Sequence, residues 1–327
     1  MKHIASFLSF RYAQGLALCL FALSWTSCKP IQTPIPSTPL PTPQEKPFRI
    51  VAYATDAILA ELIPYSQLTH INYSFLIPNS DGTFAPLNND WKLKNIVVNA
   101  HNQNVLVSLA VGGWGWDEQF EQMAAVPESR IAFVKNLVDI VNQYQLDGVD
   151  IDWEYPDPGQ SSQNFLALMQ GLRTALPDKL ISTATISFGD ETGLGIPNQV
   201  FDLVDYVNVM TYDGEIHGSL DEFEQGLKYW SERGVPQEKI NIGVPFYSRP
   251  SEISFSKLIQ FDPAAAQMDS IEYNGSSEKY NGIPSVKTKT EIAMQKAGGI
   301  MFWALDHDIQ GEFSLVNAIF EVVHHIK

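Results

Sequence analysis

The sequence has few cysteines and few basic residues, and both shortages exclude whole classes of protein. Only two cysteines occur in the 327 residues, at positions 19 and 28, so neither a disulfide-rich scaffold nor a zinc site built from several cysteines can form. Lys and Arg total 21 against 37 Asp and Glu, a formal net charge of −16. Because so acidic a chain repels polyphosphate, we expect no nucleic-acid partner.

A long hydrophobic segment and a phosphate-binding glycine loop are also missing. The apolar run over residues 15–25 is far shorter than the roughly 20 residues that a membrane-spanning helix needs. Residues 112–115 read GGWG and have neither the GxGxxG nor the GxxxxGK[ST] spacing. Hydrophobic residues make up 45% of the chain, so it can bury a substantial core in one large domain or two small ones.

The first 27 residues have the features of a secretory signal peptide. Lys2 and Arg11 precede the short apolar run, and small residues precede Cys28. The segment Trp25-Thr26-Ser27-Cys28 resembles the lipobox of bacterial lipoproteins, in which the cysteine becomes the lipidated first residue, although Trp25 stands where Leu is usual. We predict a lipoprotein-type signal peptide over residues 1–27 and lipidation of Cys28, on a membrane facing the periplasm or the cell exterior. Secretion without lipidation is the alternative.

A proline-rich segment follows the signal peptide. Residues 29–47 contain seven prolines, which lack a backbone N–H and favour extended polyproline II. We predict that residues 28–47 form a semi-rigid tether and that residues 48–327 form the domain it carries. A PxxP ligand for another protein is the alternative reading of the tether.

The remaining 280 residues alternate between short β-rich runs and helical patterns. We expect eight strands, at residues 48–54, 68–76, 105–111, 148–154, 180–188, 204–211, 240–247 and 299–305. Helical spacing is clearest at residues 130–143 and 161–175, with further helices near 95–102, 220–233, 288–296 and 314–325. This order is typical of the α/β class and predicts a single (β/α)8 TIM barrel, while periodicity alone leaves a doubly wound open sheet possible.

The fourth expected strand carries carboxyl groups at alternate positions. Residues 147–156 read DGVDIDWEYP. Because alternate side chains of a strand share a face, Asp150, Asp152 and Glu154 are expected to point into the barrel and the intervening apolar residues towards the helices. Burial and like charges raise carboxyl pKa values, so some of the three are expected to be protonated near neutral pH. The pattern favours acid catalysis, with magnesium or calcium binding and a structural acidic face as alternatives.

The same ten residues resemble the DxxDxDxE signature of glycoside hydrolase family 18, the chitinases and related endo-N-acetylglucosaminidases. Segments similar to the family's strands two, six, seven and eight follow in order: Leu68–Phe75, MTYD at Met210–Asp213, GVPFYSR at Gly243–Arg249 and GGIMFW at Gly298–Trp303. In strand three, Ala110 stands where the family's SxGG pattern has Ser. That Ser supports the acidic row by hydrogen bonding, so its replacement is expected to alter the pKa of Asp150.

The resemblance implies retaining, substrate-assisted hydrolysis of an N-acetylated polysaccharide, without a metal or organic cofactor. Glu154 would be the general acid, Asp152 would orient the substrate acetamide, Asp150 would share a proton with Asp152, and Tyr212 would donate to the acetamide oxygen. Substrate contacts are expected from Trp303, Trp114, Tyr53, Phe75, Met210, Asp213, Tyr247 and Arg249. A core or rim role is the alternative for each of these residues, and for Met210 that alternative is packing. His217 is expected at the solvated surface, with a substrate contact as the alternative.

The spacing after the seventh strand bears on the type of cleavage. Only 49 residues separate Arg249 from Gly299, too few for a helix together with the large α+β domain that many chitinases insert here. We therefore expect an open groove and a monomeric enzyme that cleaves chitin or chito-oligosaccharides internally. The alternatives are an endo-β-N-acetylglucosaminidase acting on the chitobiose core of N-glycans and a non-catalytic chitinase-like lectin, which the intact Glu154 disfavours.

Overall fold

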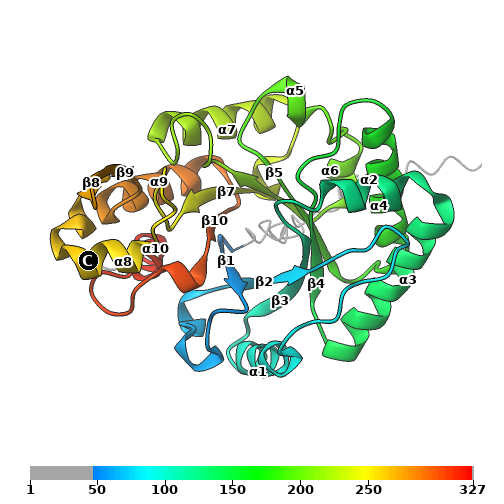
Figure 1. Ribbon diagram of the computed structural model, residues 1–327, viewed down its shortest axis with the longest axis horizontal. Helices are drawn as coiled ribbons and strands as arrows, with labels where there is room; N and C mark the ends of the chain where they lie inside the picture. The colour runs from blue at the N-terminus through cyan, green and yellow to red at the C-terminus, as the bar shows by residue number, and fades with distance from the viewer. Residues whose placement is uncertain (1–46, 326–327) are drawn as a thin grey trace, which may run out of the picture. The chain divides into compact units, whose positions relative to one another are not determined.

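Eight parallel strands close into a barrel in the computed structural model, which describes residues 47–325 (Figure 1). The strands are β1 (Arg49–Thr55), β2 (His70–Leu76), β3 (Leu106–Gly112), β4 (Gly148–Asp152), β5 (Leu180–Ile186), β6 (Tyr206–Met210), β7 (Ile240–Pro245) and β10 (Gly299–Trp303). Their order around the barrel is β1-β10-β7-β6-β5-β4-β3-β2. The predicted (β/α)8 barrel is confirmed. The predicted signal peptide, the lipidation at Cys28 and almost all of the tether lie outside the described residues.

Helices surround the barrel (Figure 1). They are α1 (Asp90–His101), α2 (Asp117–Ala125), α3 (Pro127–Tyr144), α4 (Gln160–Ala175), α5 (Asp190–Gly193), α6 (Val200–Leu203), α7 (Leu220–Glu232), α8 (Phe255–Phe261), α9 (Ile283–Lys296) and α10 (Leu315–Val323). Each helix expected from the sequence is present, whereas α2, α5, α6 and α8 were not predicted. Within residues 47–325, none of the helices combines the length and the apolar character that crossing a membrane requires.

The two faces of β4 separate as the alternation predicts. Val149 and Ile151 are 0% exposed and belong to the core between barrel and helices. Trp153, just past the strand, stacks on Phe120 of α2 with ring centroids 5.1 Å apart, and its Nε1 donates to Asp117 Oδ1 at 2.7 Å. Burying an aromatic side chain of this kind contributes on the order of 2 kcal/mol. The outward face therefore fixes β4 against α2, and the inward face is left for polar side chains.

A small hairpin lies between β7 and β10. It pairs β8 (Ser270–Tyr273) antiparallel with β9 (Ser276–Lys279), and Figure 1 shows it with α8 and α9 at one side of the barrel. No large domain is inserted among the described residues of this segment, in agreement with the prediction. The hairpin itself was not predicted, because the sequences SIEY and SSEK have little of the apolar alternation that marks a strand.

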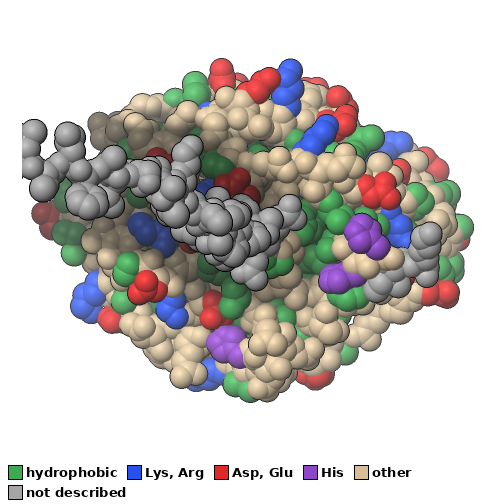
Figure 2. Space-filling view, turned by 180° about the vertical axis from the view of Figure 1, so that it is seen from behind, with side chains coloured by type: hydrophobic (Ala, Val, Ile, Leu, Met, Phe, Trp, Pro, Cys, Tyr) green, Lys and Arg blue, Asp and Glu red, His purple; other side chains and the backbone are tan. Residues whose placement is uncertain are grey.

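The outer surface carries charges of both signs. Figure 2 shows acidic and basic side chains scattered over the visible face, with hydrophobic side chains between them. Over the part of this face that is drawn in colour, neither sign is gathered in one patch. Such a surface favours solubility and does not by itself select a charged partner.

Candidate active site

A cleft of about 790 Å³ opens where the carboxyl ends of the barrel strands meet. The residues predicted to act on or contact the substrate that line it are Glu154, Asp152, Tyr212, Trp303, Trp114, Tyr53, Phe75, Met210, Asp213, Tyr247 and Arg249. Asp150 is the exception, because it lies below the cleft lining and is 0% exposed. The barrel thus brings together residues that lie as far apart in the chain as Tyr53 and Trp303.

Asp150 is held by three hydrogen bonds. Its Oδ2 accepts from the Tyr53 hydroxyl at 2.7 Å. Its Oδ1 accepts from Ser182 Oγ at 2.6 Å and from Asn208 Nδ2 at 3.0 Å. Burial raises the pKa of Asp150, and these hydrogen bonds oppose the rise. In the barrel, Asp150 lies between Ala110 of β3 and Ser182 of β5. Ser182 supplies the hydroxyl that Ala110 lacks.

Ser182 and Asn208 were not recognised in the sequence. Asn208 sits between two valines of β6 that are 0% exposed, and its Oδ1 accepts from Asn241 Nδ2 at 2.9 Å. A polar residue in the middle of an otherwise apolar barrel strand is the signal that could have identified Asn208. Ser182 gave no such signal, because β5 also contains Thr183 and Thr185. The cleft lining also includes residues that the motifs did not indicate, namely Tyr155, Ile186, Ser187, Gly214, Glu252 and His307.

Asp152 and Glu154 follow Asp150 at alternate positions and have few hydrogen-bond donors. Asp152 is 3% exposed, and its Oδ1 has no hydrogen-bond partner among the described residues. Burial and the charges of Glu154 and Asp150 raise the pKa of Asp152 well above its usual range. Burial and the charge of Asp213 raise the pKa of Glu154 to about 7, against a hydrogen bond with Tyr155. A carboxyl with this pKa can both give and accept a proton near neutral pH.

Asp213, just after β6, has the opposite environment. Its Oδ1 accepts from Arg249 Nε at 2.7 Å, and its Oδ2 accepts from the Tyr247 hydroxyl at 2.6 Å. Burial alone would raise the pKa of Asp213, but the hydrogen bonds from Arg249 and Tyr247 and the positive charge of Arg249 hold it well below its usual range. Burial raises the pKa of the preceding Tyr212 well above 10, so Tyr212 stays a neutral hydroxyl donor.

His217 is buried, so the expectation that it lies at the solvated surface is wrong. It is 8% exposed. Its Nδ1 accepts from the backbone N–H of Asp213 at 3.1 Å, and its Nε2 lies 3.1 Å from the carbonyl oxygen of Tyr247. This pattern requires the proton on Nε2. His217 therefore joins the loop after β6 to the chain that follows β7.

Aromatic rings form one wall of the cleft. Trp303 stacks against Phe75 with ring centroids 5.4 Å apart and contacts Tyr53 at 5.8 Å. Gly113 has φ +86°, and a Cβ there would lie 2.7 Å from the Phe75 ring, so only glycine permits this approach. Trp114 is 80% exposed at the rim. Such ring faces suit stacking with the apolar C–H faces of sugars.

The acidic row has no arrangement that suits a metal ion. Over the part of the chain from residue 47 to residue 325, no group of three or more His, Cys, Asp or Glu side chains is placed to hold one. Both oxygens of Asp150 already accept hydrogen bonds from protein donors. The arrangement instead presents a proton-carrying carboxyl, a second carboxyl with a free acceptor atom and a hydroxyl donor around one cleft.

Known proteins share this fold and these motifs. The family model described as glycosyl hydrolases family 18 matches residues 49–308. The crystal structure of a chitinase from Flavobacterium johnsoniae superposes with a TM-score of 0.74 at 27% identity, covering 86% of this chain and 96% of that chain. Endochitinase 1 of Metarhizium anisopliae is 25% identical to this chain, and the match covers 78% of each of the two chains. A probable endochitinase of Caenorhabditis elegans is 29% identical to this chain. The match covers 55% of this chain and only 36% of that relative.

Proposed function

The chain belongs to glycosyl hydrolases family 18, and we propose that it is a chitinase that cleaves β-1,4-linked N-acetylglucosamine chains internally. The observation that carries the proposal is the pairing of Glu154, whose pKa burial raises to about 7, with the unpartnered Oδ1 of Asp152 in one aromatic-walled cleft. The chitinases similar to this chain support chitin oligomers as the substrate class.

In the first step, Glu154 donates its proton to the glycosidic oxygen as the bond to the anomeric carbon breaks. The oxygen of the substrate's own 2-acetamido group attacks the anomeric carbon, which gives a cyclic oxazolinium. Asp152 Oδ1 accepts a hydrogen bond from the acetamide N–H, and the neutral Tyr212 hydroxyl donates to the acetamide oxygen. No carboxylate of the protein attacks the sugar, so the substrate supplies the nucleophile.

In the second step, the ionised Glu154 takes a proton from water, and that water attacks the anomeric carbon from the face that the leaving group vacated. The bond between the anomeric carbon and the acetamide oxygen breaks, which restores the 2-acetamido group. The product therefore keeps the β configuration. Asp150 shares a proton with Asp152 and helps to stabilise the cation, because its hydrogen bonds from Tyr53, Ser182 and Asn208 fix it beneath Asp152.

We propose further that Cys28 is lipidated and that residues 28–47 hold the catalytic domain off a membrane facing the periplasm or the cell exterior. The small residues before Cys28 and the density of prolines after it support this location. Metabolic labelling with a radioactive fatty acid tests it: the full-length chain should be labelled, and Cys28→Ser should not. A labelled Cys28→Ser chain would refute lipidation at this cysteine.

One substrate panel tests the activity. The purified protein is incubated with chitin hexamer, peptidoglycan and a high-mannose glycoprotein, and products are followed from the first minutes. We expect internal cleavage of the hexamer to products of β configuration. Release of disaccharide alone from the start would contradict internal cleavage, cleavage of the glycoprotein only would favour the N-glycan enzyme, and binding without cleavage would favour a lectin.

A further inference from the structure

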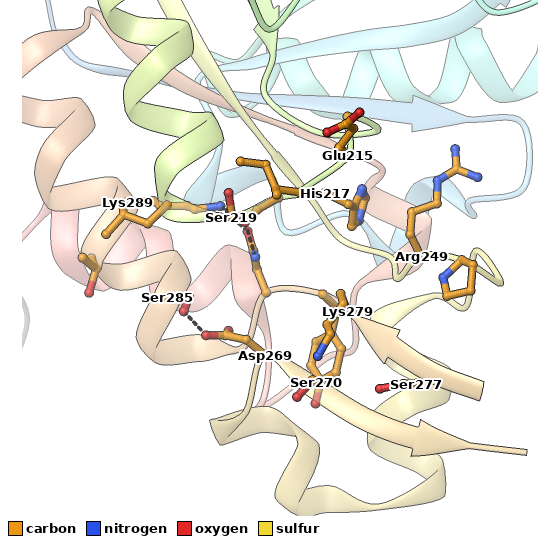
Figure 3. Close-up of a pocket in the computed structure, with 18 residues that line it drawn as sticks. Glu215, His217, Ser219, Arg249, Asp269, Ser270, Ser277, Lys279, Ser285 and Lys289 are labelled. Carbon is orange, nitrogen blue, oxygen red and sulfur yellow. Dashed lines mark hydrogen bonds between the residues drawn. The ribbon is translucent and has the colours of Figure 1, made fainter. Parts of the chain in front are cut away.

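A second hollow, named here the side pocket, adjoins the catalytic cleft. Its volume is about 810 Å³, close to the 790 Å³ of the cleft. Its walls come from the loop between β6 and α7, the β8–β9 hairpin and α9 (Figure 3). Gly214 and Arg249 line both hollows, so the two spaces meet at these residues.

Arg249 connects the cleft to the hairpin. Its guanidinium binds Asp213 in the cleft, and Figure 3 shows this group directed away from Ser270 and Ser277 of the hairpin. Its backbone pairs with Lys279 of β9 through N–H···O bonds of 2.9 and 2.8 Å. A ligand that extends past the Arg249 side chain therefore passes from the cleft directly to the hairpin wall.

The floor of the side pocket is fixed by a buried network. Lys289 of α9 is 1% exposed, and its Nζ donates to Asn281 Oδ1 at 2.6 Å and to the carbonyl oxygen of Gly218. Asn281 Nδ2 donates to the same carbonyl at 2.7 Å. These bonds tie the loop between β6 and α7 to α9. The side pocket is thus formed before any ligand arrives, which lowers the entropic cost of binding.

The lining combines apolar groups, polar groups and charges of both signs. Ile216 and Leu220 are each 44% exposed. A ligand that covers large apolar side chains in a cavity gains binding free energy from their burial. The hairpin adds hydroxyl groups and Lys279, and the charged lining residues include both cations and anions: Arg249, Lys279, Lys289, Glu215 and Asp269. This mixture suits a neutral ligand that has both apolar patches and hydrogen-bonding groups. An N-acetylated sugar is such a ligand, with C–H faces, an acetamide methyl group and hydroxyls.

We infer that the side pocket binds further N-acetylglucosamine units of the same substrate chain, beyond those held in the catalytic cleft. The inference rests on the proposed function and extends it, because it makes catalytic efficiency depend on substrate length. Short oligomers fill the cleft alone, whereas longer ones also reach the wall formed by Ile216, Leu220 and the hairpin.

Filling the side pocket tests the inference. Ser277 is exposed on the hairpin and lines the pocket, so Ser277→Trp should lower kcat/KM for chitin hexamer about tenfold and leave kcat/KM for the trimer unchanged. Leu220→Ser removes apolar contact instead and should lower the hexamer value about threefold. The matched controls are Gln103→Trp, in the exposed loop before β3, and Val98→Ser, a 59% exposed position of α1, and neither should change any rate.

The outcomes separate this inference from the proposed function. If the wild type cleaves both oligomers and Ser277→Trp cleaves the hexamer as well as the wild type does, the side pocket has no role and the proposed function stands. If the wild type cleaves no chitin oligomer, the proposed function fails. Calorimetric titration with the hexamer then tests the role of the side pocket separately from activity, by comparing Glu154→Gln with the double variant that also carries Ser277→Trp. Equal affinities of the two variants would overturn the inference, and about tenfold weaker binding by the double variant would support it.

Discussion

Three carboxyl groups of the cleft, Asp152, Glu154 and Asp213, lie in two different environments, and the contrast explains which of them can act as an acid. Burial raises the pKa of Asp152 and Glu154, which receive few hydrogen bonds. Asp213 is subject to the same effect of burial, yet hydrogen bonds from Arg249 and Tyr247 and the charge of Arg249 lower its pKa. The number and charge of the donors, and not burial alone, therefore decide the direction of the shift.

The two environments are also coupled. The negative charge of Asp213 is one cause of the raised pKa of Glu154. Because Arg249 and Tyr247 keep Asp213 ionised, they indirectly help to keep Glu154 protonated. Glu154, which has few donors, and Asp213, which has several, thus act together to hold one proton where the glycosidic oxygen is to receive it.

Replacing the acid should have the largest effect on this contrast. Glu154→Gln keeps the shape of the side chain but removes its transferable proton, so we expect kcat for chitin hexamer to fall by about 10³-fold. Steady-state kinetics with the hexamer measure this. Glu312→Gln, at an exposed position, is the matched control and should retain full activity. Undiminished activity of Glu154→Gln would overturn the assigned role.

The same substitution should stabilise the fold at alkaline pH. The pKa of Glu154 is about 7 in the folded protein and near 4.5 in an unfolded chain. Above pH 7 the folded state must therefore hold a buried, ionised carboxylate, which costs about 3 kcal/mol, and Gln removes this cost. The gain should shrink as the pH falls through 7 and vanish below about 4.5. Urea unfolding at pH 8 and pH 4 measures it.

An exposed carboxyl group provides the control for this experiment. Glu312→Gln should change the free energy of unfolding little at either pH, because that side chain is exposed. A Glu154→Gln protein that is no more stable than the wild type at pH 8 would mean that the carboxylate is solvated in the folded state.

The sequence predicted the barrel because its strands have regular signals. β4, for example, alternates carboxyl groups with Val149 and Ile151, and both faces are found as the alternation implies. The β8–β9 hairpin could not be predicted in the same way. Its side chains pair across a short exposed ribbon, so neither face needs a continuous apolar row.

Within the site, motifs identified most of the residues that line the cleft but not those that hold Asp150 from below. Asp150 belongs to a signature, whereas Ser182 and Asn208 act on it from other strands, and strand-to-strand register is not readable from one sequence. His217 follows the same rule. A histidine in a loop suggests solvent exposure, yet tertiary contacts with the backbone of Asp213 and Tyr247 bury it.

Removing the charge of Asp213 has the smallest expected effect of the three predictions, and it tests the coupling between Asp213 and Glu154 most directly. Ionised Asp213 raises the pKa of Glu154, so Asp213→Asn should lower it. Since Glu154 acts in its protonated form, the basic limb of the profile of kcat/KM against pH should move to lower pH, by about one unit. Tyr247→Phe is the matched control, because it removes a hydrogen bond to Asp213 and keeps the charge. Its basic limb should not move downwards. A basic limb that stays in place in Asp213→Asn would show that the two environments act independently.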